Sequence, residues 1–340
     1  MKISAVITLY NLEDYIGDAI ESVLAQTRQP DEIIVADDCS TDRSAEIVAK
    51  YGDRIRLIRQ QTNVGALQNS LAGLKAATGD VVAFLDGDDV WLPQKLEAIE
   101  KEFLKGEDVV LVSHDFVRVD ENLQEFNIPN DTRSNTQRIT TSRAKQDWSR
   151  EMRDAILFRR GFWLGSAYAV KRTAIPLDRF EAALEKHPGV ALSYLDMTLG
   201  PFVVAANPNS TVGFVNQVLF KYRTHRHSIN DWRSITTIEH ALRTIERWQS
   251  IHATTYRLIA DVLIDKNVAK RYKNLHDELE LVKLQFIGHK AKAIAKFVSL
   301  SPFLIKEKKI AHEFLRLLAT TLCGPATFFR LKTRLARRAA

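Results

Sequence analysis

The chain has 340 residues, of which 45% are hydrophobic and 26% charged, and a formal net charge of +6. This length is enough for one large domain or two modest domains with a buried core, and the composition excludes a disordered chain. Only Cys39 and Cys323 are present, which excludes a disulfide framework and a Cys-x-x-Cys metal site. We therefore expect a folded protein in a reducing, cytoplasmic compartment.

Positive charge is concentrated at the C-terminal end. Residues 290–340 contain twelve Lys or Arg and only two acidic residues, a net charge of +10, whereas the preceding 289 residues carry 36 basic and 40 acidic groups. This distribution argues against a basic nucleic-acid-binding fold and predicts a local anionic partner for the tail. The weakly charged run Leu317 to Phe329 is too short to span a bilayer and is interrupted by Gly324-Pro325.

Apolar, β-rich runs alternate with helical patterns over the first 100 residues. The alternation predicts an α/β fold, with a mostly parallel sheet and covering helices. The expected strands are Ile3–Leu9, Glu32–Ala36, Ile55–Ile58 and Val81–Leu85, and the expected helices are Leu12–Gln26, Ser44–Lys50 and Ala66–Ala77. Acidic residues follow the second strand (Asp37-Asp38) and the fourth (Asp86 to Asp89), so both clusters are expected at the carboxyl edge of the sheet.

The segment Asp86-Gly87-Asp88-Asp89 puts three carboxylates within four positions, directly after an apolar strand. Their mutual repulsion calls for a counter-ion. Hard oxygen ligands suit Mg²⁺ or Mn²⁺, which keep open positions for phosphate oxygens. The alternative is a polar turn in which Asp86 or Asp88 caps the helix that starts near Pro93.

Four motifs occur in a characteristic order over the first 100 residues. They are Val6 to Asn11, Ile33 to Asp42, Asn63-Val64-Gly65 with Asn69 and Gly79-Asp80, and Leu85 to Pro93. As a set they resemble the family 2 glycosyltransferases of the GT-A fold. The resemblance implies a Rossmann-like α/β domain that transfers a sugar, with inversion, from a nucleotide-diphospho-sugar and uses Mg²⁺ or Mn²⁺.

The same resemblance assigns roles to residues of the first half. Asp38 would accept the uracil N3–H, with Asp37 beside it, and Asp88 would ligate the metal, with Asp86 on the ribose or near the metal. The other residues expected at the nucleotide are Thr8, Leu9, Tyr10, Asn69 and Gly87. The alternative for Asp37-Asp38 is a helix cap. Gln68 stands where the family often has Arg, so one contact expected of the family is in doubt.

In the second half, Trp163 to Val170 resembles the acceptor-side strand of the family. Its members Trp163, Gly165 and Ser166 are candidate phosphate or acceptor contacts. The alternative is an ordinary edge strand, which would have the same residue pattern. Asp196 corresponds to the general base, which would take the proton of the acceptor hydroxyl. Leu195 replaces the usual Glu beside it, and the alternative for Asp196 is an N-cap.

The segment Leu219 to Ser228 resembles the Tyr-Arg-x-His end of the catalytic domain. By this resemblance His225 completes the metal site or contacts the diphosphate, and Arg223 or Arg226 pairs with phosphate. A structural histidine is the alternative. Residues 244–248 lack the Gln of the Gln-x-x-Arg-Trp element of processive synthases, which favours transfer of a single sugar.

From Ile235 onward the pattern is helical. We expect a GT-A domain over residues 1–232, with a nucleotide half at 1–100 and an acceptor half at 101–232. A helical region over residues 233–340 follows, with a basic amphipathic tail.

The tail carries apolar and aromatic residues opposite Lys and Arg, a pattern that suits an anionic membrane surface. The apolar positions are Phe303, Leu304, Ile310, Phe314, Leu317 and Leu318, repeated at Phe328, Phe329, Leu331 and Leu335. The alternative is packing on the catalytic domain or on a second subunit, as in a homodimer. We expect a peripheral protein at the inner face of the cell membrane.

Two functions from different classes follow. The first is an enzyme of polysaccharide biosynthesis that transfers a hexosyl or N-acetylhexosaminyl group to a hydroxyl acceptor, such as a lipid-linked bacterial surface glycan. The second is a non-catalytic nucleotide-sugar-binding or membrane-adaptor protein that keeps the fold. A Rossmann dehydrogenase fits less well, because no Gly-x-Gly-x-x-Gly follows the first strand.

Overall fold

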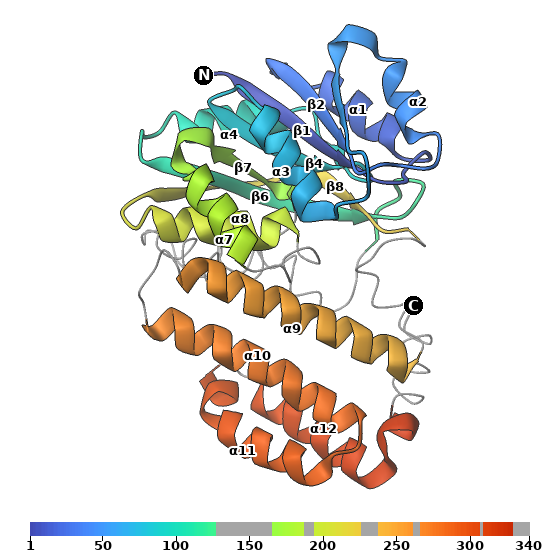
Figure 1. Cartoon of the computed structure of the whole chain (residues 1–340), viewed down its shortest axis with the longest axis vertical. Coiled ribbons are helices and arrows are strands. Elements are labelled where there is room, and N and C mark those ends of the chain that lie inside the picture. The colour runs from blue at the N-terminus through green and yellow to red at the C-terminus, as the bar shows by residue number, and fades with distance from the viewer. Residues whose placement is uncertain (127–164, 187–193, 226–236, 261–265, 307–308, 329–340) are drawn as a thin grey trace. The chain divides into compact units, whose positions relative to one another are not determined.

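The structure is a computed structural model that describes residues 1–126, 165–186, 194–225, 237–260, 266–306 and 309–328. The chain divides into an α/β unit, Met1–His225 with Arg257–Ile264, and a helical unit, Arg226–Tyr256 with Asp265–Ala340. Figure 1 shows the sheet in the first unit and the long helices of the second. The expected boundary at residue 232 stays a prediction, because helix α9 (Ile238–Ala260) contributes residues to both units.

Eight strands form one sheet in the order β3-β2-β1-β4-β7-β6-β8-β5. Their bounds are β1 Ile3–Leu9, β2 Glu32–Asp37, β3 Arg56–Arg59, β4 Val81–Asp86, β5 Val90–Trp91, β6 Val109–Val119, β7 Tyr168–Lys171 and β8 Thr211–Arg223. The four strands predicted from the sequence pair in parallel. Beyond them β7 is antiparallel to both β4 and β6, whereas β8 is parallel to β6 and antiparallel to β5. The α/β class is confirmed, and the sheet is mixed in its second half.

The helices of the α/β unit cover both faces of the sheet. Their bounds are α1 Ile16–Leu24, α2 Ser44–Ala49, α3 Ala66–Ala76, α4 Lys95–Phe103, α7 Leu177–Lys186 and α8 Leu195–Ala206. Alternate residues of β1 point to opposite faces. Ile3, Ala5 and Ile7 belong to a core cluster with residues of α1 and α4. On the other face α3 approaches so closely that a Cβ on Gly73 would lie 2.5 Å from a methyl group of Val6. Because β1 is buried on both faces, its side chains can reach a ligand only at the carboxyl end of the strand.

The helical unit contains α9, α10 (Lys266–Phe286), α11 (Lys290–Lys306) and α12 (Ile310–Cys323). One apolar cluster joins α10, α11 and α12 through residues that include Leu281, Leu300 and Leu317. A second cluster joins α9 and α10, and Phe328 packs against it. None of the helices in the described ranges is long and apolar enough to cross a membrane.

Candidate active site

The two acidic clusters meet at the carboxyl edge of the parallel strands, as predicted from their positions. Leu9 at the end of β1 is in register with Asp37 at the end of β2. On the other side of β1, Thr8 is in register with Asp86 at the end of β4. Three neighbouring strands therefore present the candidate residues along one edge, which is where open α/β sheets bind ligands.

Asp86 is held from three directions. The Thr8 hydroxyl donates to its Oδ1 at 3.0 Å, and its own backbone N–H donates to the Ser166 hydroxyl at 2.9 Å. Gly165 lies against the carboxylate, because a Cβ at this position would come within 3.3 Å of Asp86 Oδ2. Burial, followed by the charge of Asp88, raises the pKa of the Asp86 carboxyl to about 6. The ionised form of Asp86 is thus disfavoured unless a cation binds close to it.

Asp88 contacts His225 directly. The Nε2 atom of His225 lies 3.0 Å from Asp88 Oδ2, and the imidazole is buried while 25% of the Asp88 side chain remains exposed. The ring of Tyr15, just before α1, lies 4.5 Å from the imidazole centroid and holds it in place. The structure thus brings together the two residues that the sequence analysis expected at a metal.

A buried lysine, Lys95 on α4, was not expected from the sequence. Its ammonium group donates to the Ser166 carbonyl and lies 4.2 Å from the Trp91 ring centroid. Burial lowers the pKa of Lys95, while the charges of Asp89 and Asp86 raise it. The lysine lies in an amphipathic helix pattern, so sequence alone gave no signal that it faces inward.

Asp89, the third carboxylate, is a structural residue. It is fully buried, accepts the Ser166 hydroxyl at 2.6 Å and accepts the backbone N–H of Arg223 at 2.9 Å. Burial and the charges of Asp88 and Asp86 raise the pKa of its carboxyl. Asp89 therefore ties the end of β8 and the Gly165–Ala167 turn to the acidic loop.

The carboxylates of this cluster repel one another. Among the described residues, the charge of Asp88 raises the pKa of Asp86 and of Asp89, Lys95 acts on Asp86 and Asp89, and His225 contacts Asp88. Because burial also disfavours the charged form of Lys95, ionisation of all three carboxylates calls for a further cation. No group of three or more His, Cys, Asp or Glu in the described ranges is arranged to hold an ion by itself. Two or three protein ligands, completed by phosphate oxygens, are however what Mg²⁺ or Mn²⁺ takes in nucleotide sites. The Asp88–His225 pair with Asp86 nearby fits such an ion.

Asp37, Asp38 and Asn69 have partners within the protein. Asp37 is buried, accepts from the backbone N–H and hydroxyl of Ser40, and pairs with Arg59. Both Asp38 oxygens accept backbone N–H groups from residues 64 and 65, at 2.7 and 2.9 Å. The Asn69 amide donates to the carbonyl oxygens of Leu9 and Ala36 and so links β1 to β2. These bonds order the carboxyl edge of the sheet, and the predicted base contacts of these residues stay predictions.

The remaining residues of the first half lie beside this edge. Leu9 is buried, whereas 46% of Tyr10 is exposed and available to a ligand. Gly87 packs on β1, because a Cβ there would come within 2.7 Å of the Thr8 carbonyl oxygen. A side chain at position 87 would push the acidic loop away from β1.

Arg223 is engaged by α1. Its guanidinium pairs with Asp18 at 2.7 Å and lies 4.9 Å from the centroid of the Tyr15 ring. The side chain is buried, so a phosphate contact would have to draw the guanidinium away from Asp18. The predicted phosphate role of Arg223 stays a prediction.

The predicted general base, Asp196, lies in the first turn of α8, whose N-cap is Tyr194. Its side chain lies outside the described part of the structure, as do Trp163 and Arg226. The predicted roles of these three residues therefore remain untested.

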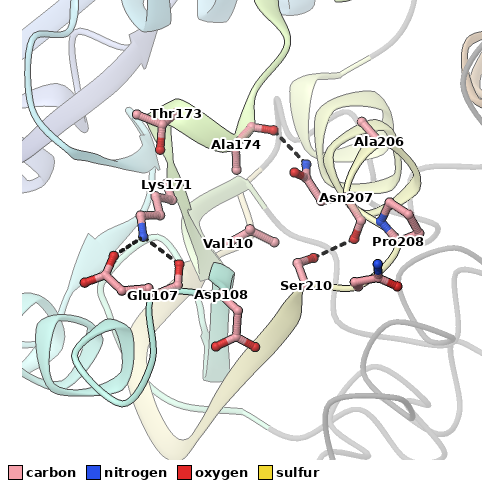
Figure 2. A pocket seen from close by; sticks show the side chains of 11 residues that line it. Glu107, Asp108, Val110, Lys171, Thr173, Ala174, Ala206, Asn207, Pro208 and Ser210 are labelled. Atoms are coloured by element: carbon pink, nitrogen blue, oxygen red, sulfur yellow. Dashed lines mark hydrogen bonds and ion pairs between the residues drawn. The ribbon is translucent and has the colours of Figure 1, made fainter.

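A polar hollow of about 440 Å³ lies at the opposite edge of the sheet (Figure 2). Lys171, one of its lining residues, is in register with Val81 at the start of β4, the end remote from Asp86. Its polar groups bond to one another: Lys171 to Glu107, Asn207 to the Ala174 carbonyl and Ser210 to the Asn207 carbonyl. No predicted site residue lines this hollow, so it is separate from the acidic edge.

This architecture, a mixed sheet with flanking helices and an acidic carboxyl edge, is the GT-A fold. The chain superimposes on the crystal structure of S. aureus TarS residues 1–349 with a TM-score of 0.57 and 16% sequence identity, over 100% of this chain and 92% of that one. Residues 4–164 match the model of the family described as glycosyl transferase family 2. The α/β unit therefore contains a family 2 glycosyltransferase domain of the GT-A fold, which confirms the predicted family and fold class.

Two curated relatives match 36% and 28% of this chain. An uncharacterized glycosyltransferase of Nostoc sp. strain PCC 7120 is 46% identical over 126 residues, which is 36% of this chain and 38% of that protein. A Bacillus subtilis protein named for teichuronic acid biosynthesis, TuaG, is 41% identical over 98 residues, 28% of this chain and 39% of that protein. The chain thus spans less than two fifths of the length of these curated relatives.

Proposed function

We propose that this protein is a metal-dependent, inverting glycosyltransferase that moves one sugar from a UDP-linked donor to a hydroxyl of a lipid-linked bacterial surface glycan. The observation that carries the proposal is the acidic edge, where Asp86, Asp88 and Asp89 repel one another and His225 touches the partly exposed Asp88. Ionising three carboxylates this close together is costly unless a divalent cation is part of the working site. The name of the TuaG relative supports a surface polysaccharide as product.

In this proposal Asp88 and His225 hold Mg²⁺ or Mn²⁺, with Asp86 toward the ribose or the ion. When bound, the ion neutralises the nucleotide diphosphate that leaves the anomeric carbon. Asp38 reads the base, and its two backbone N–H bonds keep the carboxylate in one orientation for that contact. Tyr10, half exposed beside this edge, lines the nucleotide.

The transfer itself exchanges one bond for another. The acceptor oxygen bonds to the anomeric carbon while the bond from that carbon to the diphosphate oxygen breaks, and the electron pair leaves with the nucleotide diphosphate. Asp196 takes the proton of the acceptor hydroxyl as the new bond forms. Its position in the first turn of α8 is compatible with this role, since the dipole at a helix N-terminus favours the carboxylate form.

A donor screen tests the proposal. UDP-, GDP- and dTDP-linked sugars are tested with Mn²⁺ or Mg²⁺ and with chelator, following both thermal stabilisation and release of nucleotide diphosphate. We expect stabilisation by one nucleotide class, dependent on the ion, and slow hydrolysis of the matching sugar donor. Binding with no release, even with a glycan acceptor extract, would favour the non-catalytic alternative, and no binding of any nucleotide would reject both.

A further inference from the structure

The outer surface of α11 and α12 carries two exposed apolar stripes. On α11, the stripe comprises Ile294, Val298 and Ile305, with exposed fractions of 48, 64 and 61%. On α12 it comprises Phe314, Leu315, Leu318 and Leu322, with exposed fractions between 43 and 74%. The spacings of three, four and seven residues put each set on one side of its helix. We call these seven residues the apolar face.

The opposite sides of both helices form the core of the helical unit. Ala293, Leu300 and Leu304 of α11 and Leu317 of α12 are buried in the cluster shared with α10. The ring of Phe297 on α11 lies 6.1 Å from that of Phe314 on α12, so the two helices touch at the border of the apolar face. The apolar stripe predicted from the sequence is therefore divided, with Leu304 and Leu317 packing inward and Phe314 and Leu318 facing outward. Core packing accounts for the apolar character of Leu304 and Leu317, but not for that of Phe314 and Leu318.

The charges around the apolar face are positive. Within α11 and α12 the one acidic residue is Glu313, which is buried and paired with Arg316. Lys296 and Arg316 are engaged by the helical unit itself, Lys296 through Asp277. Lys309, just before α12, pairs with Glu278 of α10.

Lys290, Lys292 and Lys306 are exposed on α11. These three cations, rather than all the basic residues of the helices, are thus available to a partner. A surface of this kind complements an anionic one.

We propose that the apolar face docks on an anionic lipid surface, with Phe314, Leu315 and Leu318 entering the interface and Lys290, Lys292 and Lys306 pairing with lipid headgroups. An amphipathic surface with aromatic and aliphatic residues and peripheral lysines binds in the plane of such an interface. A second copy of the chain fits less well, because the same lysines would then face one another. This proposal does not depend on the proposed transfer reaction.

Vesicle flotation with the full chain tests the proposal. The vesicles contain phosphatidylcholine alone or with about 30% phosphatidylglycerol. Lys290→Gln, Lys292→Gln and Lys306→Gln are combined in one variant, and Phe314→Glu and Leu318→Glu in another. Each cation near an anionic surface is worth about 1 kcal/mol, so the lysine variant should lose roughly a hundredfold in vesicle affinity. We expect the apolar variant to lose at least tenfold.

Matched controls come from the α/β unit. Leu104, which is 70% exposed, supplies an apolar control as Leu104→Glu, and Lys50, Lys101 and Lys105 supply a combined Lys→Gln control of equal charge. Both controls should bind as the parent does, and the parent should bind only the anionic vesicles, less so at high salt. Equal binding by parent and face variants would overturn the proposal, because the tail beyond residue 328 would then account for it. Absence of parent binding, or a dimer in light scattering that the face variants abolish, would also overturn it.

Discussion

The Nε2 atom of His225 lies 3.0 Å from Oδ2 of Asp88, although 137 residues separate the two in the sequence. The contact joins the end of β8 to the acidic loop after β4, and Tyr15 packs against the imidazole from a third segment. The buried histidine and the partly exposed carboxylate thus present a nitrogen and an oxygen side by side, a pair that would suit a divalent cation. The site is thus assembled by long-range packing and not by a local motif.

This relationship makes Asp88 the first residue to test. We expect Asp88→Asn to lower kcat/KM for transfer by at least a hundredfold and to abolish stabilisation by nucleotide with Mn²⁺, because the variant loses a charged ligand. Its thermal unfolding without ion should be unchanged or slightly higher, since one charge of a repelling cluster is gone. Asp53→Asn, at an exposed position, is the matched control. Full activity of Asp88→Asn, or of the parent in excess chelator, would refute the metal role.

The predicted general base gives a different kinetic signature. Asp196→Asn should lower kcat by a factor of about 10² to 10⁴ and leave donor affinity unchanged, because a base acts on the acceptor proton. Donor affinity is measured by nucleotide-dependent thermal stabilisation or calorimetry, and kcat by release of nucleotide diphosphate. Asp178→Asn, in the first turn of α7, is the control for a carboxylate at a helix start. A parallel fall in donor affinity would mean that Asp196 binds the donor or supports the fold.

Much of the parallel half of the sheet could be predicted from the sequence. The strand expected at Ile3–Leu9 has these bounds in the structure, because a short apolar run between polar turns has few alternatives. The antiparallel insertion of β7 between β4 and β6 could not be predicted, since a residue pattern does not specify the direction of a partner strand. The order of the sheet depends on contacts between segments more than 80 residues apart.

The candidate site divides in the same way. The acidic residues at strand ends were visible in the sequence, because their positions follow directly from strand boundaries. The contacts around these residues were not visible: Arg223 pairs with Asp18 of α1, and Lys95 is buried where the charges of Asp89 and Asp86 act on it. These contacts arise from tertiary packing. From the sequence pattern alone, a lysine or arginine is expected on the solvent-exposed face.

The raised pKa of Asp86 predicts a pH dependence of stability. The folded-state pKa is about 6 against an ordinary value of 3.8, so between these pH values the folded protein binds the proton more tightly than the unfolded chain. Stability from this group is therefore present at low pH and is lost as the pH rises from about 4 to about 6. Asp86→Asn has no carboxyl to ionise at this position and does not lose this stability. The difference in unfolding free energy between Asp86→Asn and the parent should therefore rise by on the order of 2 kcal/mol from pH 4 to pH 6.

The measurement is chemical denaturation in chelator at several pH values between 4 and 7.5. Asp53→Asn again serves as the control, because an exposed carboxyl should give no such trend. Addition of Mn²⁺ at pH 7.5 should stabilise the parent more than at pH 5, since the ion favours ionised carboxylates. A constant difference between Asp86→Asn and the parent across the whole range would contradict the prediction.

Lys95 is expected to be the main internal counter-charge of the acidic loop. In Lys95→Met a side chain of similar length keeps the packing on Trp91 but leaves the carboxylates of Asp86 and Asp89 without their cation. Removing one partner of a buried charged group costs about 3–5 kcal/mol, so we expect a loss of about 3 kcal/mol in unfolding free energy at pH 7. Lys101→Met, an exposed position on the same helix, should change stability by less than about 0.5 kcal/mol.

A second substitution separates the charge of Lys95 from its packing. Asp89→Asn, added to Lys95→Met, removes a buried negative charge. The amide oxygen can still accept the N–H of Arg223 in place of Oδ1, and the amide NH2 in place of Oδ2 can donate to the Ser166 hydroxyl. If the missing cation causes the instability, the double variant should recover at least about 1 kcal/mol relative to Lys95→Met alone. If the effects of the two substitutions simply add, Lys95 acts through packing and through its bond to the Ser166 carbonyl. Another group would then have to balance the negative charge of the carboxylates.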